Sequence, residues 1–330
     1  MVGLTISGKI YKRHFDGSVN AHPELPEFDY VRLATLVEAS RFLADHAGEA
    51  RPLLGGTDIF VRMRDGFWRD RYLVDVKNLD GTGKIEFNPE TGLTLGAAVN
   101  MNQVIGSPDV QQHYSLLAEA CRSVASYQLR TRATVVGNVC NASPAGDTIG
   151  ACLALGGVAI IHNVDGFRQV PLTDFFVGPG KTILQPGDIV TAIRFPPPPK
   201  GGTGVYIKLG RNRMSDLAIV GVTVFVHPDA SVAAGYRFHI ALASVDPVPL
   251  LVPQAGDYLA NHPITAGAFE EASSIAQQAS NPIDDVRSSA RYRKVMVRRL
   301  TRRALEIAWN KMAMNPADSS GVPGFEQSIQ

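Results

Sequence analysis

The chain has 330 residues, 45% of them hydrophobic, which is enough for two domains with real cores and excludes a fibrous, collagenous or disordered protein. Its 32 Lys and Arg residues nearly balance its 31 Asp and Glu residues, so a net charge of +1 excludes a global field that would attract nucleic acid or an anionic membrane. No apolar run approaches the ~20 residues of a membrane span, and within positions 1–20 charged residues recur from Lys9 to Asp16. We therefore expect no membrane span, no secretory signal and a cytoplasmic location.

The chain also lacks the residue spacings that are typical of metal sites. Its three cysteines, Cys121, Cys140 and Cys152, have no CxxC spacing and are too few for a disulfide framework. None of the eight histidines pairs with another at metal-ligand spacing. We therefore expect reduced cysteines in packing roles and no metal bound by the chain itself.

The N-terminal part of the chain predicts an arm followed by a strand, glycine turn, helix and strand. Residues 1–25 show no hydrophobic period, which indicates an arm outside the core. After it we predict a helix that a capping box begins at Thr35 and that ends near Gly48, a strand over 51–54, a helical turn over 59–64 and a strand over 72–76. The turn after the first of these strands contains Gly55 and Gly56.

The middle of the chain combines strand patterns with one long polar segment. We predict a hairpin over 85–99, a helix over 115–126, and strands over 158–161 and 189–195. Residues 131–148 are rich in Gly, Asn, Ser and Pro, which predicts a long irregular loop. The run of Pro and Gly over 196–202 indicates a domain boundary.

Beyond this boundary the sequence predicts a smaller α+β domain. Three antiparallel strands are expected over 205–209, 219–226 and 236–245, with helices after them. The last helix, over about 289–311, has a basic face opposite an apolar stripe, which is more typical of a solvated face or a subunit contact than of a nucleic-acid surface. The predicted domains are an arm over 1–25, a first domain over 26–200 with subdomains of about 26–84 and 85–200, a second domain over 203–312 and a tail over 313–330.

Gly55 and Gly56, after a strand and before a helix, form the first candidate binding site. Glycine lacks Cβ, so its amide can approach an anion closely, and a helix N-terminus adds a favourable dipole. This chemistry suits a pyrophosphate. A Gly-Gly pair at a strand end is also an ordinary turn, so the assignment needs a second element.

The second element is the polar segment over 133–147. Thr134 and Asn138 can hydrogen-bond phosphate or ribityl oxygens, and Asp147 can accept from sugar hydroxyls. The same composition also suits a loop whose Asn, Ser and Thr side chains satisfy their own backbone. The residues alone leave both interpretations open.

Two familiar nucleotide-binding motifs are disfavoured. Residues 178–182 resemble the end of a P-loop, but Phe175 occupies the position where that motif requires its first glycine. No predicted strand is followed by GxGxxG, which disfavours a Rossmann site. A bound nucleotide must therefore be held by another arrangement.

Four blocks of the sequence together resemble the FAD-binding medium subunit of the molybdenum hydroxylases, the xanthine dehydrogenase and carbon monoxide dehydrogenase family. The blocks are Leu53-Leu-Gly-Gly-Thr-Asp-Ile59 with 62–66; Thr131-Arg-Ala-Thr-Val-Val-Gly-Asn138 with 142–147; 175–182 through 193–196; and 206–211 with Asp216 and 284–293. The resemblance covers roughly residues 27–310 in the expected order.

The resemblance implies an α+β fold in two parts. The first, over 26–200, would be a two-subdomain FAD-binding domain of the p-cresol methylhydroxylase or vanillyl-alcohol oxidase type. The second, over 203–312, would be an α+β C-terminal domain of the carbon monoxide dehydrogenase flavoprotein type, with a three-stranded antiparallel sheet and helices.

The resemblance also implies which residues hold FAD. Two segments would embrace the pyrophosphate: Leu53, Leu54, Gly55, Gly56, Thr57, Asp58 and Ile59, together with Thr134, Val135, Val136, Gly137 and Asn138. The other implied contacts are Ser143 and Asp147 at sugar hydroxyls, Ile183 or Leu184 at the adenine side, and Lys208 near the isoalloxazine. Val136 replaces the more usual first glycine of the second segment, which leaves one close backbone contact there open.

The resemblance further implies the role of the chain. In this family a molybdenum-pterin centre in a large subunit converts the substrate, and two [2Fe-2S] clusters in a small subunit relay electrons to FAD. The chain would then be an oxidoreductase subunit in a dimer of heterotrimers, with no catalytic residue of its own because the flavin performs the redox chemistry. Some relatives bind a [4Fe-4S] cluster through a four-cysteine insertion, which this chain lacks, so we expect no cluster in it.

Two other interpretations stay open. A free-standing FAD oxidoreductase related to the peptidoglycan-precursor reductase would need acid and substrate-binding residues in the C-terminal half, where we find no convincing set. A flavin-free subunit that only bridges partners would have no use for the glycine loops at Gly55, Gly56 and Gly137, which carry an entropic cost.

Overall fold

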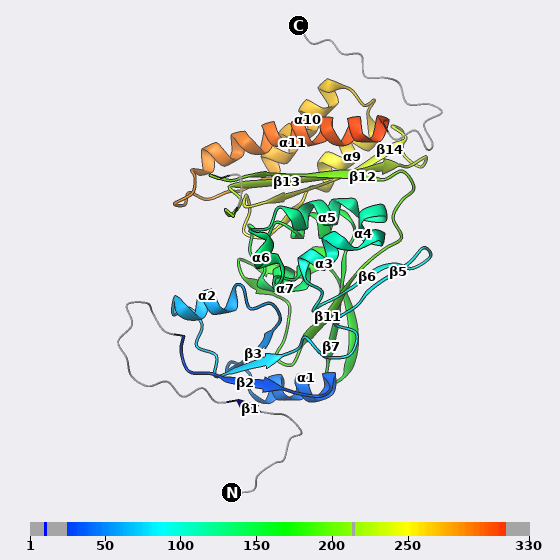
Figure 1. Ribbon diagram of the computed structural model, residues 1–330. Helices are drawn as coiled ribbons and strands as arrows, with labels where there is room; N and C mark the ends of the chain where they lie inside the picture. The colour runs from blue at the N-terminus through cyan, green and yellow to red at the C-terminus, as the bar shows by residue number, and fades with distance from the viewer. Residues whose placement is uncertain (1–9, 12–24, 213–214, 315–330) are drawn as a thin grey trace, which may run out of the picture. The chain divides into compact units, whose positions relative to one another are not determined.

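The computed structural model describes residues 10–11, 25–212 and 215–314 (Figure 1). The predicted arm over 1–25 and tail over 313–330 therefore lie almost entirely outside the described residues. The chain forms two compact units and passes between them several times. The first unit comprises residues up to 107 together with 125–142 and 156–196, and the second comprises 108–124, 143–155 and the chain from 197 onward.

The first unit contains a small sheet whose central strands are parallel. Its order is β1-β2-β4-β3, with β1 at Ile10–Tyr11, β2 at Asp29–Arg32, β3 at Ala50–Leu53 and β4 at Tyr72–Asp75. Successive side chains of β4 enter different cores, because a strand alternates its faces. Val74 packs in the core that includes α1 (Leu36–Asp45), and Leu73 packs in the core that includes α2 (Ile59–Arg64).

A second, antiparallel sheet completes the framework of this unit. Its order is β5-β6-β11-β7-β8, with β5 at Ile85–Asn88, β6 at Gly92–Gly96, β7 at Val158–Asn163, β8 at Gly166–Pro171 and β11 at Ile189–Phe195. β11 is the central strand, and all of its residues but Arg194 are buried. The unit's shorter elements are α3 (Met101–Gly106), α6 (Tyr127–Arg130), α7 (Val135–Asn141), the 3-10 turn η1 (Leu172–Asp174), β9 (Phe176–Gly178) and β10 (Lys181–Thr182).

The second unit is built on one antiparallel sheet of order β12-β13-β14-β15. Its strands are β12 (Thr203–Leu209), β13 (Val220–Pro228), β14 (Tyr236–Ala243) and β15 (Leu250–Leu251). Helices α9 (Pro253–Asn261), α10 (Ala266–Ala279) and α11 (Ala290–Ala313) cover one face, and α4 (Pro108–His113), α5 (Ser115–Arg122) and α8 (Ile149–Ala154) pack on the other (Figure 1).

The apolar core of the second unit lies between β13 and α11. Alternate valines of β13 and the apolar stripe of α11 are fully or almost fully buried together: Val220, Val222, Val224 and Val226, with Val297, Leu300, Ala304 and Ala308. The apolar stripe that the sequence indicated for the last helix is therefore the face of α11 that packs against the sheet.

The structure corrects three expectations about individual elements. The sheet of the second unit has four strands, because the two residues of β15 pair with Ala241 and Leu242, and so short a strand gives no periodic signal. The segment over 131–148 is not wholly irregular, because α7 occupies its middle. The helix expected over 115–126 ends at Arg122, and Ala125 then has a positive φ of 40°.

Within the described parts of the chain, no helix combines the length and the apolar character needed to cross a membrane.

Candidate functional site

The first predicted flavin segment is a tight connection between β3 and α2 in the first unit. Leu53 ends β3 and Ile59 begins α2, so Leu54 to Asp58 form the loop. A Cβ added at Gly55 would lie 2.1 Å from the carbonyl oxygen of Arg132, which is backbone and cannot move aside locally. The loop therefore packs directly on the chain that leads into the second predicted segment.

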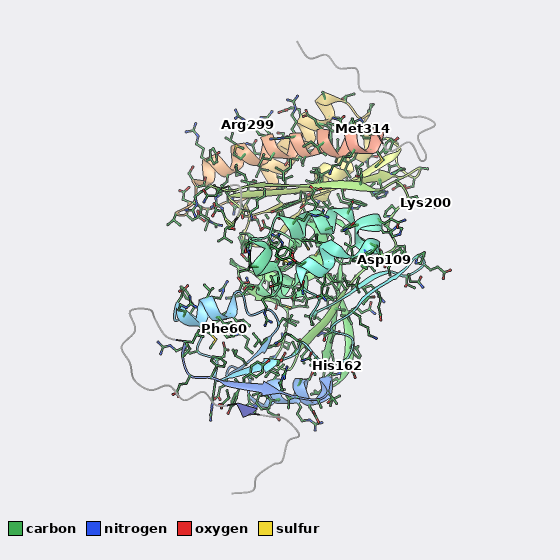
Figure 2. The ribbon with its side chains drawn as sticks, viewed as in Figure 1. Phe60, Asp109, His162, Lys200, Arg299 and Met314 are labelled. Atoms are coloured by element: carbon green, nitrogen blue, oxygen red, sulfur yellow. The ribbon has the colours of Figure 1, made fainter. Side chains whose placement is uncertain are left out.

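Gly56 is required for a different reason. Its φ of +74° lies in the left-handed region that side chains other than glycine rarely adopt. An added Cβ would also lie 2.6 Å from the ring of Phe60, which Figure 2 labels on α2. Both glycines thus allow the loop to pack closely, Gly55 on the Arg132 backbone and Gly56 against the Phe60 ring.

The second predicted segment begins α7. Thr134 is its N-cap, and its hydroxyl oxygen accepts a hydrogen bond from the backbone N–H of Gly137 at 2.9 Å. Val135 and Val136 are fully buried. The Val136 side chain, which stands where a glycine is more usual, therefore packs into the core of the unit.

Asp58 and Asn141 connect the two segments through their side chains. The Asn141 side chain lies near the Asp58 carboxylate, and burial raises the pKa of Asp58 although Arg62 and Asn141 oppose the shift. The Asn141 Oδ1 atom is buried and has no hydrogen-bond partner among the described residues. Sequence reasoning missed Asn141, although it lies only three residues beyond the predicted Asn138.

The third predicted segment is attached to the C-terminal end of α7. The backbone N–H of Gly180, between β9 and β10, donates to the carbonyl oxygen of Ala142 at 3.0 Å. Ile183 and Leu184 follow β10, and the N–H of Ile183 donates to the Phe175 carbonyl oxygen at 3.1 Å. The structure thus joins all three predicted segments of the first unit around α7.

The remaining predicted residues, Ser143, Asp147 and Lys208, belong to the second unit. Lys208 Nζ lies 2.8 Å from Asp147 Oδ2 and 3.2 Å from the Ser123 carbonyl oxygen. The hydroxyl oxygen of Ser143 accepts from the Ala145 N–H at 3.3 Å. Lys208 and Asp147 are therefore brought together, whereas Ser143 closes a local turn.

Tyr206 is a further residue of this cluster that sequence reasoning missed. Its hydroxyl donates to Asp147 Oδ1 at 2.7 Å, so both carboxylate oxygens are engaged. Burial raises the pKa of Asp147 against the opposing effects of Lys208 and Tyr206, and burial followed by the Asp147 charge raises that of Tyr206 well above its usual value. Tyr206 and Lys208 lie two residues apart on one strand, a spacing that places them on the same face and was visible in the sequence.

The residues of the first unit fit FAD by their chemistry. Gly55 packs the first loop on the Arg132 backbone, which brings that loop close to the N-terminus of α7, an environment that suits a phosphate. No group of three or more His, Cys, Asp or Glu side chains in the described ranges could hold a metal ion.

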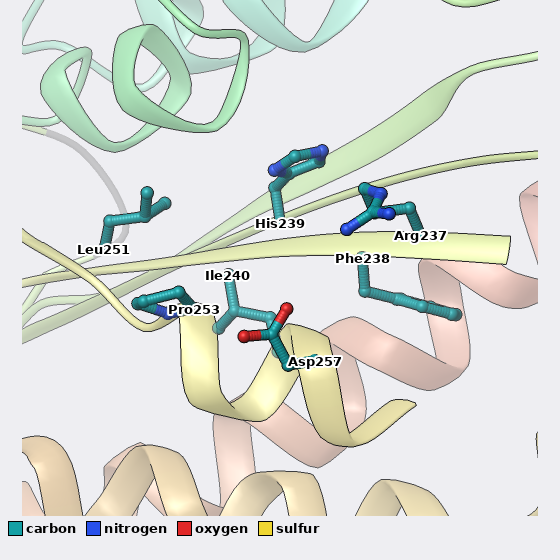
Figure 3. Close-up of a pocket in the computed structure, with 7 residues that line it drawn as sticks. All are labelled: Arg237, Phe238, His239, Ile240, Leu251, Pro253 and Asp257. Atoms are coloured by element: carbon teal, nitrogen blue, oxygen red, sulfur yellow. The ribbon is translucent and has the colours of Figure 1, made fainter. Parts of the chain in front are cut away.

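A separate pocket lies beside β14 in the second unit, between this strand and α9 (Figure 3). Arg237 and His239 project from one side of the strand and Asp257 approaches from α9 on the other. Its volume of about 160 Å³ is small for a dinucleotide, and no predicted site residue lines it.

Comparison with known proteins identifies two family matches. Residues 26–198 match the model described as the FAD binding domain in molybdopterin dehydrogenase, and residues 205–308 match the CO dehydrogenase flavoprotein C-terminal domain. The chain is 30% identical over 280 residues to the xanthine dehydrogenase FAD-binding subunit of Escherichia coli O157:H7, covering 84% of this chain and 95% of that subunit.

Carbon monoxide dehydrogenase provides two further matches. The medium chain of the Hydrogenophaga pseudoflava enzyme is 29% identical over 288 residues, which cover 87% of this chain and 99% of that one. A solved structure of the same organism's enzyme, lacking the Mo-pyranopterin moiety of the molybdenum cofactor, superposes with a TM-score of 0.83 at 28% identity and covers 87% of this chain and 99% of that chain.

The glycine loops and these matches define an FAD-binding flavoprotein subunit of an oxidoreductase. The chain belongs to the family of FAD-binding subunits of molybdopterin dehydrogenases, which includes those of xanthine dehydrogenase and carbon monoxide dehydrogenase. The family, the FAD cofactor and the oxidoreductase class expected from the resemblance are confirmed, as is a mixed α and β fold with an FAD-binding part and a C-terminal part.

Proposed function

We propose that this chain is the electron-transfer subunit of a heteromeric molybdenum-containing hydroxylase or dehydrogenase. It would pass electrons between [2Fe-2S] clusters of a partner subunit and an external acceptor, and FAD would supply the redox chemistry. The observation that carries the proposal is the direct packing of Gly55 on the Arg132 carbonyl, which brings the first predicted FAD segment against the chain that leads into the second.

The proposal assigns each site residue a role. Leu53 to Ile59 and Thr134 to Asn138 would hold the pyrophosphate, and Ile183 or Leu184 would cover the adenine side. Ser143 and Asp147 would meet sugar hydroxyls while Lys208 lies near the isoalloxazine. Asp147 can accept a hydrogen bond from a sugar hydroxyl in addition to those from Lys208 and Tyr206, because each carboxylate oxygen accepts more than one hydrogen bond. The fold of the FAD-binding part would be of the p-cresol methylhydroxylase type, over 26–200, followed by a C-terminal domain over 203–312.

The proposed partners are a large subunit with a molybdenum-pterin cofactor and a small subunit with two [2Fe-2S] clusters. Support comes from the relatives, one named the medium chain of carbon monoxide dehydrogenase and one solved as a carbon monoxide dehydrogenase that lacks the Mo-pyranopterin moiety of the molybdenum cofactor. We propose a dimer of such heterotrimers in the cytoplasm, without nucleic acid.

The first experiment is an absorption spectrum and metal analysis of the chain alone and of what co-purifies with it. Flavin bands without iron in the chain, and molybdenum plus iron in the complex, are the expected result. A colourless chain that does not take up added FAD would contradict the proposal and favour a bridging subunit. In addition, Gly56→Asp should abolish flavin binding, because a side chain there would be strained at a φ of +74° and would meet the Phe60 ring, so the loop must deform.

A charge-reversal variant tests whether the exposed basic face of α11 docks a partner subunit. Truncating the chain before α11 would unfold the second unit, because Val297 and Leu300 belong to its core. Arg299 and Arg303 are exposed on α11, so Arg299→Glu with Arg303→Glu changes charge without touching that core. If this face docks a subunit, the double variant loses that subunit in co-purification, whereas a fully retained complex would exclude the face.

A further inference from the structure

The block over 284–293 carries part of the family resemblance, but the proposed function gives it no role. It leads into α11, whose first turn contains Arg293, and this side chain is only 2% exposed. Burying a charge is unfavourable unless the charge is paired and hydrogen-bonded. Arg293 meets this requirement with its two terminal nitrogens, which donate to Asp285 Oδ1 and to the Ser244 carbonyl oxygen, each at 2.6 Å.

Ser244, which follows the end of β14, has a backbone conformation that serine seldom adopts. It is buried, and its φ of 66° lies in the left-handed region. Its hydroxyl donates to the Ala218 carbonyl oxygen at 2.8 Å, and its backbone N–H donates to the Pro144 carbonyl oxygen at 2.7 Å. Such a conformation persists only where the surrounding structure over-determines it. The bond from Arg293 to the Ser244 carbonyl oxygen is therefore part of what holds this N–H toward Pro144.

The bond to Pro144 reaches the residue directly after Ser143, one of the proposed FAD contacts. Ser143 begins a turn in which its carbonyl oxygen accepts from the Gly146 N–H at 2.9 Å. At the far end of this turn, Asp147 has its own attachment to two side chains of β12. Within the second unit, the Ser143 end of the segment is thus fixed through Ser244 and the Asp147 end through β12.

We propose that Arg293 is a positioning residue for FAD, which acts through the Ser244 backbone to hold Ser143 where it meets a sugar hydroxyl of the cofactor. This inference rests on the proposed contact between Ser143 and FAD. Because Arg293 is enclosed by its own chain, it acts from behind the segment rather than by touching the cofactor. A contact residue binds well only if the groups behind it lock its position.

Arg287 belongs to the same cluster and provides a matched control. It donates to Asp285 Oδ2 at 2.6 Å and to the Ala218 carbonyl oxygen at 3.1 Å. Neither of these bonds involves the Ser244 backbone or the turn that begins at Ser143. Arg287→Met therefore breaks an ion pair with the same aspartate and should lower stability while leaving FAD affinity unchanged.

The test is a titration of the full-length apo chain with FAD, followed by flavin fluorescence, with urea denaturation of each variant alongside. We expect Arg293→Met to weaken FAD binding about 10-fold. Arg293→Lys should restore only part of this loss, because a lysine keeps the charge near Asp285 but lacks the planar fork that reaches two partners.

A double variant tests whether Arg293 acts through Ser143. Ser143→Ala removes the proposed contact, so Arg293→Met should weaken FAD binding less in the Ser143→Ala chain than in the wild type. Loss of stability alone would not produce this coupling. Equal losses in the two backgrounds would contradict an action through Ser143.

A second pair of variants decides the matter if Arg293→Met does not fold. Ser244→Ala and Ser244→Gly both remove the hydroxyl, but only glycine adopts a φ of 66° without strain. We expect Ser244→Gly to bind FAD about threefold more tightly than Ser244→Ala, because the strained conformation that directs the N–H to Pro144 is easier to keep. Equal affinities of these two variants would overturn the inference.

The other outcomes are distinguishable. A folded Arg293→Met chain with wild-type FAD affinity would show that Ser143 needs no support from Arg293. Equal losses of affinity in Arg293→Met and Arg287→Met would reduce the effect to general stability and would also overturn the inference. A wild-type chain that binds no FAD would overturn the proposed function itself, and this inference with it.

Discussion

Lys208 and Asp147 form an enclosed ion pair that fastens the segment over 143–155 to β12 within the second unit. The two charged atoms are 2.8 Å apart, and the side chains of Lys208 and Asp147 are only 15% and 8% exposed. They lie 61 residues apart in the chain. Because Tyr206 engages the other oxygen of the same carboxylate, Asp147 is held by two neighbours of one strand face.

Removing the cation should leave a buried carboxylate without its charge partner. We expect Lys208→Met to lower the free energy of unfolding by about 2 kcal/mol, because breaking one side of a buried pair exposes the desolvation penalty of the other. Urea denaturation of the wild type and variant measures this difference.

Lys200→Met is the matched control, since Lys200 is exposed and should change stability by less than about 0.5 kcal/mol. Asp147→Asn combined with Lys208→Met should be less destabilised than the sum of the two single variants. Strict additivity would contradict a direct interaction between Lys208 and Asp147.

The hydroxyl of Thr134 should matter for both folding and flavin binding. Thr134→Val removes the N-cap of α7 and should lower the free energy of unfolding by about 1 kcal/mol. Because α7 begins at the predicted pyrophosphate site, FAD affinity should fall as well, whereas Thr134→Ser should keep both properties.

Thr265→Val provides the comparison, because Thr265 caps α10 in the other unit by accepting from the Ala268 N–H at 3.1 Å. It should lose similar stability and bind FAD normally in a fluorescence titration. Equal losses of affinity in Thr134→Val and Thr265→Val would mean that the effect is only one of general stability.

The close contact of the first glycine loop gives a steric prediction. Gly55→Ala would place a methyl group 2.1 Å from the Arg132 carbonyl oxygen, so the loop must move and we expect a loss of about 2 to 3 kcal/mol together with most FAD binding. Gly83→Ala in the same unit meets no atom within 4 Å and should be nearly neutral. A Gly55→Ala chain with normal flavin content would show that the two loops do not form the site.

Long local patterns made much of this fold predictable, whereas short elements and distant contacts did not. The capping box at Thr35 predicted the start of α1, and the Thr35 hydroxyl accepts from the Glu38 N–H at 3.2 Å. The seven residues of α7 are too few for a clear helical period, and their Gly and Asn content is typical of a loop.

In the candidate site, too, local patterns were predictable from the sequence and distant contacts were not. Local composition pointed to Gly55, Gly56 and Thr134, but the packing of Gly55 on the Arg132 carbonyl is a contact across more than 70 residues that no local pattern encodes. The ion pair of Lys208 likewise depends on how β12 lies against the segment that contains Asp147.

His239, on β14, should make the stability of the second unit depend on pH. Burial, the neighbouring His227 and the charge of Arg237 lower the pKa of His239 from 6.5 to about 4. At a pH above 6.5, the pKa of this residue in the unfolded chain, His239 is neutral in both the folded and the unfolded state. As the pH falls from 6.5 toward 4, the unfolded chain binds a proton that the folded chain does not, so stability decreases over this window.

Between pH 7 and pH 5 this effect should remove on the order of 2 kcal/mol of unfolding free energy, measured by urea denaturation at each pH. His239→Gln cannot take up the proton, so its stability should fall less over the same interval. His262→Gln changes an exposed histidine at the end of α9 and should keep the wild-type dependence. If His239→Gln and the wild type lost stability equally, His239 would have the same proton affinity in the folded and unfolded chain, and the acid sensitivity would have to come from other groups.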